Sequence, residues 1–268
     1  MKTVGQWLQE RPHKIPETVH RQLLAHVLKR NTAWLIAHDD VTVINQQARQ
    51  IKDYQRQFID GIPLAYILGE QAFWDLTLKV NEHTLIPRPD TELIIETILD
   101  LNLSPSSILD LGTGSGALAL VLARLFPNAS VTATDISSQA ITVAQSNAQK
   151  YHINNICFIQ SHWFNNIQGT FDLIVSNPPY IEPDDSHLSG LTHEPITALV
   201  ADNNGLADLQ TIIRLAPQFL NHNGILLVEH GYNQQQTVAE LFTDKHYCKI
   251  KTLFDIEQRP RATMGYCK

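Results

Sequence analysis

Cysteine is scarce in this 268-residue sequence, and its three copies suggest no pairing. Cys157, Cys248 and Cys267 are an odd number without a C-x-x-C spacing, so neither a disulfide framework nor a zinc knuckle is indicated. Twelve histidines are present, but none falls in an H-E-x-x-H or similar ligand spacing. The sequence therefore predicts reduced cysteines and no metal site.

Long apolar runs and excess positive charge are also missing. No stretch approaches the roughly 18 to 20 apolar residues of a membrane span, and the start MKTVGQWLQERPHK lacks the apolar run of a signal peptide. Lys and Arg number 20 against 27 Asp and Glu, for a formal net charge of -7. This balance disfavours sequence-independent binding to nucleic acid, which depends on basic side chains neutralising phosphates. We therefore expect a cytoplasmic protein with no membrane segment, no direct nucleic-acid contact and a protein substrate.

The composition and length suit a globular chain with a small and a large domain. Hydrophobic residues make up 43% and charged residues 18%, which is ordinary globular usage. From Val4 to about Ile67, apolar residues recur at three-to-four spacing, interrupted by Gly and Pro. Residues 1–72 are therefore expected to form a helical domain that recognises the substrate.

A change of pattern marks the junction between the two expected domains. Apolar residues alternate with polar ones from Phe73 to Val80, just before Asn81-Glu82-His83, which predicts a hairpin linker over residues 73–88. Pro89 then precedes an amphipathic run, which is typical of a helix start.

Residues 89–268 are expected to form an α/β domain. Short apolar runs alternate there with helical segments, which predicts a doubly wound parallel sheet with helices on both faces. The segments are Ile108–Leu111, Ala117–Leu125, Ser130–Thr134, Ala140–Ala148, Ile156–Ile159, Phe171–Val175, Leu209–Leu220 and Ile225–Val228. Such sheets bind ligands at the carboxyl ends of their strands.

A glycine-rich turn follows the first of these strands. Glycines allow a ligand to approach the backbone, and a helix N-terminus favours anionic groups. The glycines are spaced G-x-G-x-G, one residue tighter than in a dinucleotide fingerprint. This spacing resembles the first motif of class I methyltransferases, which implies S-adenosylmethionine as cofactor; a turn used only for packing is the alternative. The predicted cofactor-binding residues of the turn are Asp110, Gly112, Thr113, Gly114, Ser115 and Gly116.

Two further residues are expected to bind the cofactor. Asp135 ends the second strand, 23 residues after Gly112, where an acid accepts hydrogen bonds from a ribose diol. Its alternative role is a helix N-cap, for which Ser137 is equally suited. Trp163, after the third strand, offers a flat apolar face for adenine, although it could simply be a core aromatic.

The tetrapeptide Asn177-Pro178-Pro179-Tyr180 follows a buried strand and suggests the chemistry. The prolines stiffen the loop and remove donors, so its carbonyls are free to accept. The Asn177 side chain and the Pro178 backbone can accept both hydrogens of one NH2 group, which turns the nitrogen lone pair towards a methyl donor. We expect catalysis by Asn177, Pro178 and Tyr180, substrate contact by all four residues, and cofactor contact by Asn177. A proline-rich surface turn is the alternative.

The combination of motifs resembles a known family. The tetrapeptide after a methyltransferase glycine motif is similar both to adenine-N6 DNA methyltransferases and to protein glutamine-N5 methyltransferases. Three further segments distinguish these, and with them the whole chain is similar to the release factor glutamine methyltransferase family. The segments are Ile86-Pro87-Arg88-Pro89-Asp90-Thr91-Glu92, Ser176–Ile181, and Glu194-Pro195 followed by Ala198-Leu199.

The resemblance implies a substrate and a fold. It implies methylation of the glutamine in the Gly-Gly-Gln motif of class 1 peptide chain release factors, by a Rossmann-like class I methyltransferase domain behind a small N-terminal helical domain. A ribosomal protein glutamine methyltransferase, a nucleic-acid adenine or guanine methyltransferase, and a non-catalytic cofactor-binding module remain as alternatives. His162 and His193 depart from the family pattern, which commonly has an aspartate and an aromatic residue there.

Overall fold

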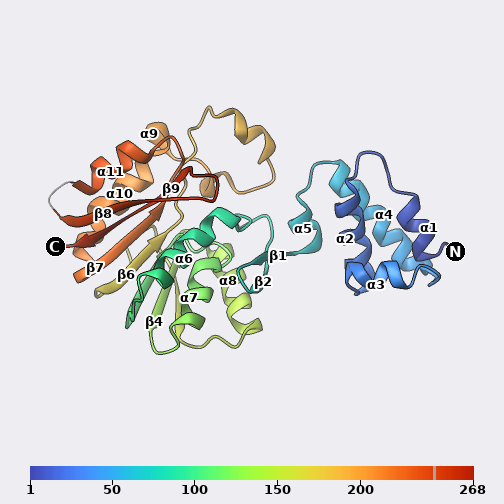
Figure 1. Ribbon diagram of the computed structural model, residues 1–268, viewed down its shortest axis with the longest axis horizontal. Helices are drawn as coiled ribbons and strands as arrows, with labels where there is room; N and C mark the ends of the chain where they lie inside the picture. The colour runs from blue at the N-terminus through green and yellow to red at the C-terminus, as the bar shows by residue number, and fades with distance from the viewer. Residues whose placement is uncertain (244–245) are drawn as a thin grey trace. The chain divides into compact units, whose positions relative to one another are not determined.

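The computed structural model describes residues 1–243 and 246–268. They form two compact units, Met1–Glu70 and Gln71–Lys268, drawn in Figure 1 from blue to red along the chain. No helix in the described ranges is long and apolar enough to cross a membrane.

The first unit is helical, as the spacing of its apolar residues predicted. Side-chain caps begin two of its helices, since Thr3 accepts from the Gln6 amide and Asn31 accepts from the Trp34 amide. The helices are α1 (Val4–Gln9), α2 (Glu17–Leu28), α3 (Thr32–Ala37), α4 (Asn45–Ile59) and α5 (Leu64–Leu68). Their core consists of Val4, Trp7, Leu24, Ala25, Val27, Leu35, Val43 and Ile51.

A two-stranded hairpin follows, earlier in the chain than the alternation predicted. Strands β1 (Glu70–Phe73) and β2 (Leu76–Lys79) flank a turn in which Trp74 has a left-handed φ of 55°. The segment expected to turn, Asn81-Glu82-His83, instead forms a local turn without a second strand. Residues 80–88 contain no strand, and the prolines at 87 and 89 cannot donate to a sheet ladder.

The second unit is built on a seven-stranded sheet of the described residues, in the order β5-β4-β3-β6-β7-β9-β8 (Figure 1). Strands β3 to β7 are parallel and confirm the predicted α/β fold. The strands are β3 (Ser107–Leu111), β4 (Ser130–Asp135), β5 (Ile156–Gln160), β6 (Phe171–Ser176), β7 (Leu220–Glu229), β8 (Tyr247–Phe254) and β9 (Pro260–Cys267).

The helices of this unit lie between the strands along the chain. They are α6 (Glu92–Asp100), α7 (Ala117–Leu125), α8 (Ser138–Lys150), α9 (Asp202–Gly205), α10 (Ala207–Leu215) and α11 (Gln235–Thr243), with short 3-10 helices η1 (Pro89–Thr91), η2 (Ser186–Gly190), η3 (Ile196–Ala198) and η4 (Ala216–Gln218). The predicted helix 209–220 is too long, because Leu220 already belongs to β7. Strands β8 and β9, which pair antiparallel at one edge, were not predicted from the sequence.

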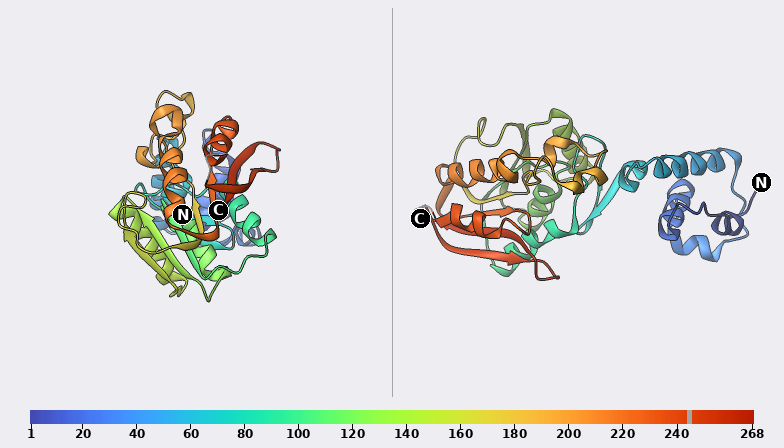
Figure 2. Two further views of the ribbon diagram at one scale, coloured as in Figure 1. Left: turned by 90° about the vertical axis from the view of Figure 1, so that its left-hand side faces the viewer. Right: turned by 90° about the horizontal axis from the view of Figure 1, so that it is seen from above.

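Both faces of the sheet are apolar, which explains why its strands are near-continuous hydrophobic runs. Along β7, Ile225 and Leu227 pack into a core with helices α6 and α7. The alternate residues Leu226 and Val228 pack into a second core with α10 and α11. The two sets of helices cover opposite faces of the sheet in the left-hand view of Figure 2.

The strand order reverses between β3 and β6. From β3 the chain continues to β4 and β5 on one side, and then returns to β6 and β7 on the other side. Loops after strands that flank such a reversal diverge and leave a crevice at the carboxyl ends. The glycine-rich turn after β3 and the Asn177 loop after β6 therefore meet at this crevice.

Candidate active site

The glycine-rich turn is held by contacts within itself and to β4. Gly112, Gly114 and Gly116 all have positive φ values, of 73°, 55° and 88°. A side chain on Gly116 would also press against Leu120 and Ala144, at 3.0 to 3.2 Å. Glycine is therefore required here both by backbone conformation and by close packing.

Asp110 supports this turn from behind. Its carboxyl is 1% exposed and accepts a hydrogen bond of 2.7 Å from the Thr113 hydroxyl. Burial raises the pKa of Asp110 to about 7, although the Thr113 hydrogen bond opposes the shift. Thr113 also donates its amide to the Thr134 carbonyl at 2.7 Å, which fixes the turn to β4.

Asp135 lies at the end of β4 and faces the turn. Its two oxygens accept from the amides of Gly114 and Ser137, both at 2.9 Å. The N-cap role belongs to Ser137, whose hydroxyl accepts from the Ala140 amide. Burial raises the pKa of Asp135. A carboxylate has about four lone-pair sites, so Asp135 keeps capacity to accept from a ligand in the crevice.

Trp163 lies against the turn from the other side. Its ring is 3.4 Å from the position that a Cβ at Gly112 would occupy, and its Nε1 donates to Asp208 of α10 at 3.0 Å. Burial raises the pKa of Asp208, while the Trp163 hydrogen bond lowers it. The indole is thus fixed at the edge of the crevice, with its Cζ3 and Cη2 atoms nearest Gly112.

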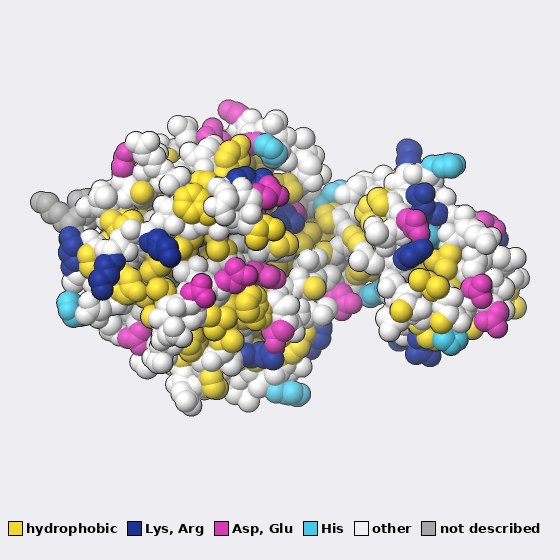
Figure 3. All heavy atoms as spheres, viewed as in Figure 1, with side chains coloured by type: hydrophobic (Ala, Val, Ile, Leu, Met, Phe, Trp, Pro, Cys, Tyr) yellow, Lys and Arg dark blue, Asp and Glu magenta, His cyan; other side chains and the backbone are white. Residues whose placement is uncertain are grey.

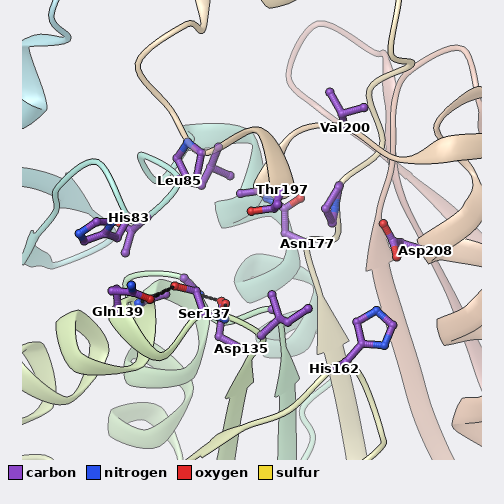
Figure 4. Close-up of a pocket in the computed structure, with 18 of the residues that line it drawn as sticks. His83, Leu85, Asp135, Ser137, Gln139, His162, Asn177, Thr197, Val200 and Asp208 are labelled. Atoms are coloured by element: carbon purple, nitrogen blue, oxygen red, sulfur yellow. Dashed lines mark hydrogen bonds between the residues drawn. The ribbon is translucent and has the colours of Figure 1, made fainter.

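These elements enclose a cavity of about 350 Å³. Figure 4 shows Asp135, Asn177 and Asp208 around it, from β4, the loop after β6 and α10. Among the predicted residues, those that line it are Gly112, Gly114, Asp135, Trp163, Asn177 and Pro179; His162 lines it too.

Four residues of the predicted cofactor set do not line this cavity. Asp110, Thr113, Ser115 and Gly116 form the inner side of the turn. Among the described residues, only the Ser115 hydroxyl is a buried side-chain polar atom without a hydrogen-bond partner. Direct ligand contact by these four residues stays a prediction.

The Asn177 loop borders two cavities. Asn177 lines the first cavity and also a second one of about 230 Å³, to which Pro178 and Tyr180 belong. The Asn177 Nδ2 donates to the Thr91 hydroxyl at 3.0 Å, and the Tyr180 hydroxyl donates to Glu229 at 3.0 Å. The side chains of Asn177 and Tyr180 are therefore anchored on the inner side of the loop, by Thr91 at the end of η1 and by Glu229 at the end of β7.

Glu194 ties the long loop after β6 to the segment before α6. Its buried carboxylate accepts from the Ile86 amide at 3.0 Å and from the Arg88 guanidinium. Arg88 lines the second cavity as well. His193, its exposed neighbour, lines neither cavity.

Comparison with known proteins places this site in a family. The Haemophilus influenzae release factor glutamine methyltransferase is 41% identical over 263 residues, covering 92% of this chain and 90% of that protein. The Vibrio cholerae protein of the same name is 42% identical over 273 residues, covering 100% and 96%. This chain belongs to the release factor glutamine methyltransferase family.

Family models match both units of this methyltransferase. A methyltransferase domain matches residues 103–261, and a PrmC N-terminal domain matches residues 2–69. A methyltransferase from Pyrococcus furiosus has a similar fold, with a TM-score of 0.55 at 19% identity over 80% of this chain and 98% of that one. A Thermus thermophilus 16S rRNA methyltransferase, solved with AdoMet and guanosine, has a TM-score of 0.51 at 18% identity over 74% and 50%.

Three residues of the methyltransferase site were missed or undervalued by sequence reasoning. Thr91 was noted only as part of a motif, and Asp208 lies in a helix with no distinguishing pattern. Glu229 could have been predicted as a site residue from the sequence. It follows the hydrophobic run Ile225–Val228, as Asp135 ends its own strand. An acid at the carboxyl end of a parallel strand is placed at the ligand-binding edge.

Proposed function

We propose that this methyltransferase transfers a methyl group from S-adenosylmethionine to the side-chain nitrogen N5 of the glutamine in the Gly-Gly-Gln motif of class 1 release factors. The observation that carries the proposal is the position of Asn177 between two cavities, one with the features of a nucleoside site and one beside the acceptor loop. The names of the relatives support the choice of substrate.

The chemistry of the first cavity suits S-adenosylmethionine. Backbone near Gly112 and Gly114 would receive the methionine part, Asp135 the ribose hydroxyls, and Trp163 the adenine ring. When bound there, the cofactor would supply an electrophilic methyl group. The turn needs no rearrangement to present its backbone, since the hydrogen bond from Gly114 to Asp135 already fixes it.

The second cavity suits the glutamine amide. An amide nitrogen is a poor nucleophile because its lone pair is delocalised. The Asn177 Oδ1 and the Pro178 carbonyl would accept its two hydrogens, align the nitrogen with the methyl group and favour loss of planarity. Fixed acceptors of this kind lower the barrier without reorganisation, and the proton can leave to water after transfer. Tyr180 would complete the wall around the amide, and Pro179, which lines the first cavity, would contact the substrate where the two cavities meet at Asn177.

We further propose that Met1–Glu70 recognises the release factor. The second unit already contains both cavities and its own hydrophobic cores. A chain that begins at Gly69, and so keeps β1 intact, should bind cofactor in calorimetry but lose methylation of the intact release factor. Full activity of that shortened chain would remove the role from the first unit.

Charge supports a protein substrate over nucleic acid. The net charge is -7, and the basic side chains on the face drawn in Figure 3 are interspersed with acidic and apolar ones. Phosphate binding favours a continuous basic surface. A release factor also places the proposed activity in the cytoplasm, where translation terminates.

Methyl transfer from labelled S-adenosylmethionine tests the substrate. The protein is incubated separately with a class 1 release factor, ribosomal protein and DNA, and the methyl group is located by mass spectrometry. We expect label on the glutamine of the Gly-Gly-Gln motif, and none on a release factor with that glutamine replaced by alanine. Label on an adenine, or on ribosomal protein alone, would overturn the proposal.

A further inference from the structure

A buried chain of hydrogen bonds runs behind the acceptor loop. Asn177 Nδ2 donates to Thr91 Oγ1 at 3.0 Å, Thr91 Oγ1 donates to Glu229 Oε2 at 2.7 Å, and the Tyr180 hydroxyl donates to Glu229 Oε1 at 3.0 Å. Thr91 is 4% exposed and Glu229 is 2% exposed. One carboxyl group therefore anchors the first and the last residue of the tetrapeptide.

The direction of these hydrogen bonds decides which end of Asn177 faces the substrate. A carboxylate only accepts, so the single hydroxyl hydrogen of Thr91 is directed to Glu229. The Thr91 oxygen then presents a lone pair to Asn177, and it can receive only the NH2 end of that amide. The carbonyl end is left for the cavities.

We propose that Glu229 and Thr91 are positioning residues that set the amide orientation of Asn177, so that its carbonyl oxygen faces the substrate NH2 group. This inference rests on the proposed function, because it concerns the acceptor that Asn177 supplies there. Without the hydrogen bond from Thr91 to Glu229, the Thr91 hydroxyl or solvent can bind either end of the Asn177 amide. An inverted Asn177 would present a donor to another donor and repel the substrate nitrogen.

The surroundings of Glu229 fit this role. Burial raises its pKa to about 7, with hydrogen bonds from Thr91 and Tyr180 and the charge of Arg261 opposing that shift and Asp90 adding to it. Above that pH Glu229 is a carboxylate, and the Thr91 hydroxyl hydrogen is directed to Oε2. Arg261 is held by Asp90 and Asp255, so it is already paired.

Two substitutions of Thr91 form a matched test. Thr91→Val keeps the shape and removes the hydroxyl, whereas Thr91→Ser keeps the hydroxyl and removes a methyl group. With saturating cofactor and release factor, single-turnover methylation should fall about 10- to 100-fold in Thr91→Val, the scale of a misplaced reacting group. Thr91→Ser should recover most of the rate, and cofactor affinity in calorimetry should be unchanged in both.

Glu229→Met provides a second variant if Thr91→Val folds poorly. Methionine is unbranched and adaptable, so it can fill the volume of the buried carboxyl, while the Thr91 and Tyr180 hydroxyls lose their acceptor and lower the stability. Glu229→Met should lose about as much rate as Thr91→Val, about 10- to 100-fold, with a thermal unfolding midpoint above the assay temperature. Wild-type rates in both folded variants would overturn the inference.

A double-mutant cycle separates this inference from the proposed function. If Thr91 acts through Asn177, Thr91→Val should cause no further loss in an Asn177→Ala background, because coupled residues are not additive. Multiplicative losses would show that Thr91 acts elsewhere and would overturn the inference alone. A wild-type rate in Asn177→Ala by itself would instead overturn the acceptor role of Asn177 in the proposed function.

Discussion

The glycine-rich turn after β3 and the acceptor loop after β6 lie side by side at the same edge of the sheet but are held in different ways. The turn is stabilised by near neighbours, since Thr113 donates to Asp110 three residues before it and Gly114 donates to Asp135 21 residues on. The acceptor loop depends on distant partners. Asn177 bonds to Thr91 86 residues away, and Thr91 bonds to Glu229 138 residues away.

Because the two segments are held differently, cofactor binding and the rate of methyl transfer should depend on different residues. The turn is a contiguous motif whose shape is set by its own glycines and one buried carboxyl, and it faces the proposed cofactor cavity. The acceptor loop takes its orientation from Thr91, at the end of η1, and from Glu229, at the end of β7, so its geometry depends on the assembled sheet. Changes in the turn should therefore alter cofactor affinity, and changes behind the loop should alter the rate of transfer.

Replacement of Gly114 is expected to have the largest effect. Its φ of 55° is unfavourable for a β-branched residue, and the added side chain would point into space beside the cavity, where no protein atom lies within 4 Å. Gly114→Val should abolish measurable cofactor binding in calorimetry while thermal unfolding stays cooperative. Unchanged affinity would remove the turn from the cofactor site.

Asn177→Ala should sharpen the contrast, because it should lower the rate of methyl transfer and leave cofactor affinity unchanged. Loss of one fixed hydrogen-bonding group costs about 10²- to 10³-fold in rate, or roughly 3 to 4 kcal/mol. Single-turnover methylation of the release factor measures this, and cofactor affinity should stay close to that of the wild-type protein. Asn177→Asp keeps acceptor oxygens, so retained activity there would identify hydrogen-bond acceptance as the requirement. A wild-type rate in Asn177→Ala would contradict the acceptor mechanism.

A smaller effect, on the binding side, is expected for Asp135→Ala. The substitution removes both the proposed ribose contact and the acceptor of the Gly114 amide. The dissociation constant of the cofactor should rise about 10- to 100-fold, the scale of one or two charge-assisted hydrogen bonds. At saturating cofactor the transfer rate should recover. Normal binding combined with lost turnover would show that Asp135 has another role.

Asp110→Asn should change mainly the pH dependence of stability. The pKa of Asp110 is raised to about 7 by burial, so its stabilising contribution is complete below the unfolded pKa, about 3.9, and is lost as pH rises through about 7. The free energy of unfolding should therefore fall less between about pH 4 and pH 7 in the variant than in the wild-type protein. Denaturant titration across this range measures the difference. Glu229, Asp135 and Asp208, whose pKa values are also raised by burial, contribute to the slope that remains. Parallel curves would show that Asp110 ionises normally.

Much of this fold could be predicted from the sequence, because its helices and strands follow local patterns of apolar residues. Helix α7 matches the predicted segment Ala117–Leu125, and the parallel strands begin and end close to their predicted bounds. The hairpin was placed too late, since Trp74 adopts the left-handed turn conformation that would more commonly mark a glycine or asparagine. Strands β8 and β9 were missed because an edge pair is defined by its neighbour β7 more than by its own sequence.

The sequence by itself determined the order of strands and helices, the glycine turn and the tetrapeptide that carries the chemistry, because each is a contiguous pattern whose backbone preferences act over a few residues. Only the tertiary structure decided that Trp163 donates to Asp208 of α10 at the edge of the cofactor cavity, 45 residues away. It also decided that Thr91 and Glu229, 138 residues apart, share a hydrogen bond behind Asn177. Such contacts form because the sheet reverses its strand order between β3 and β6 and so gathers distant strand ends, and no local preference of the chain encodes that distance.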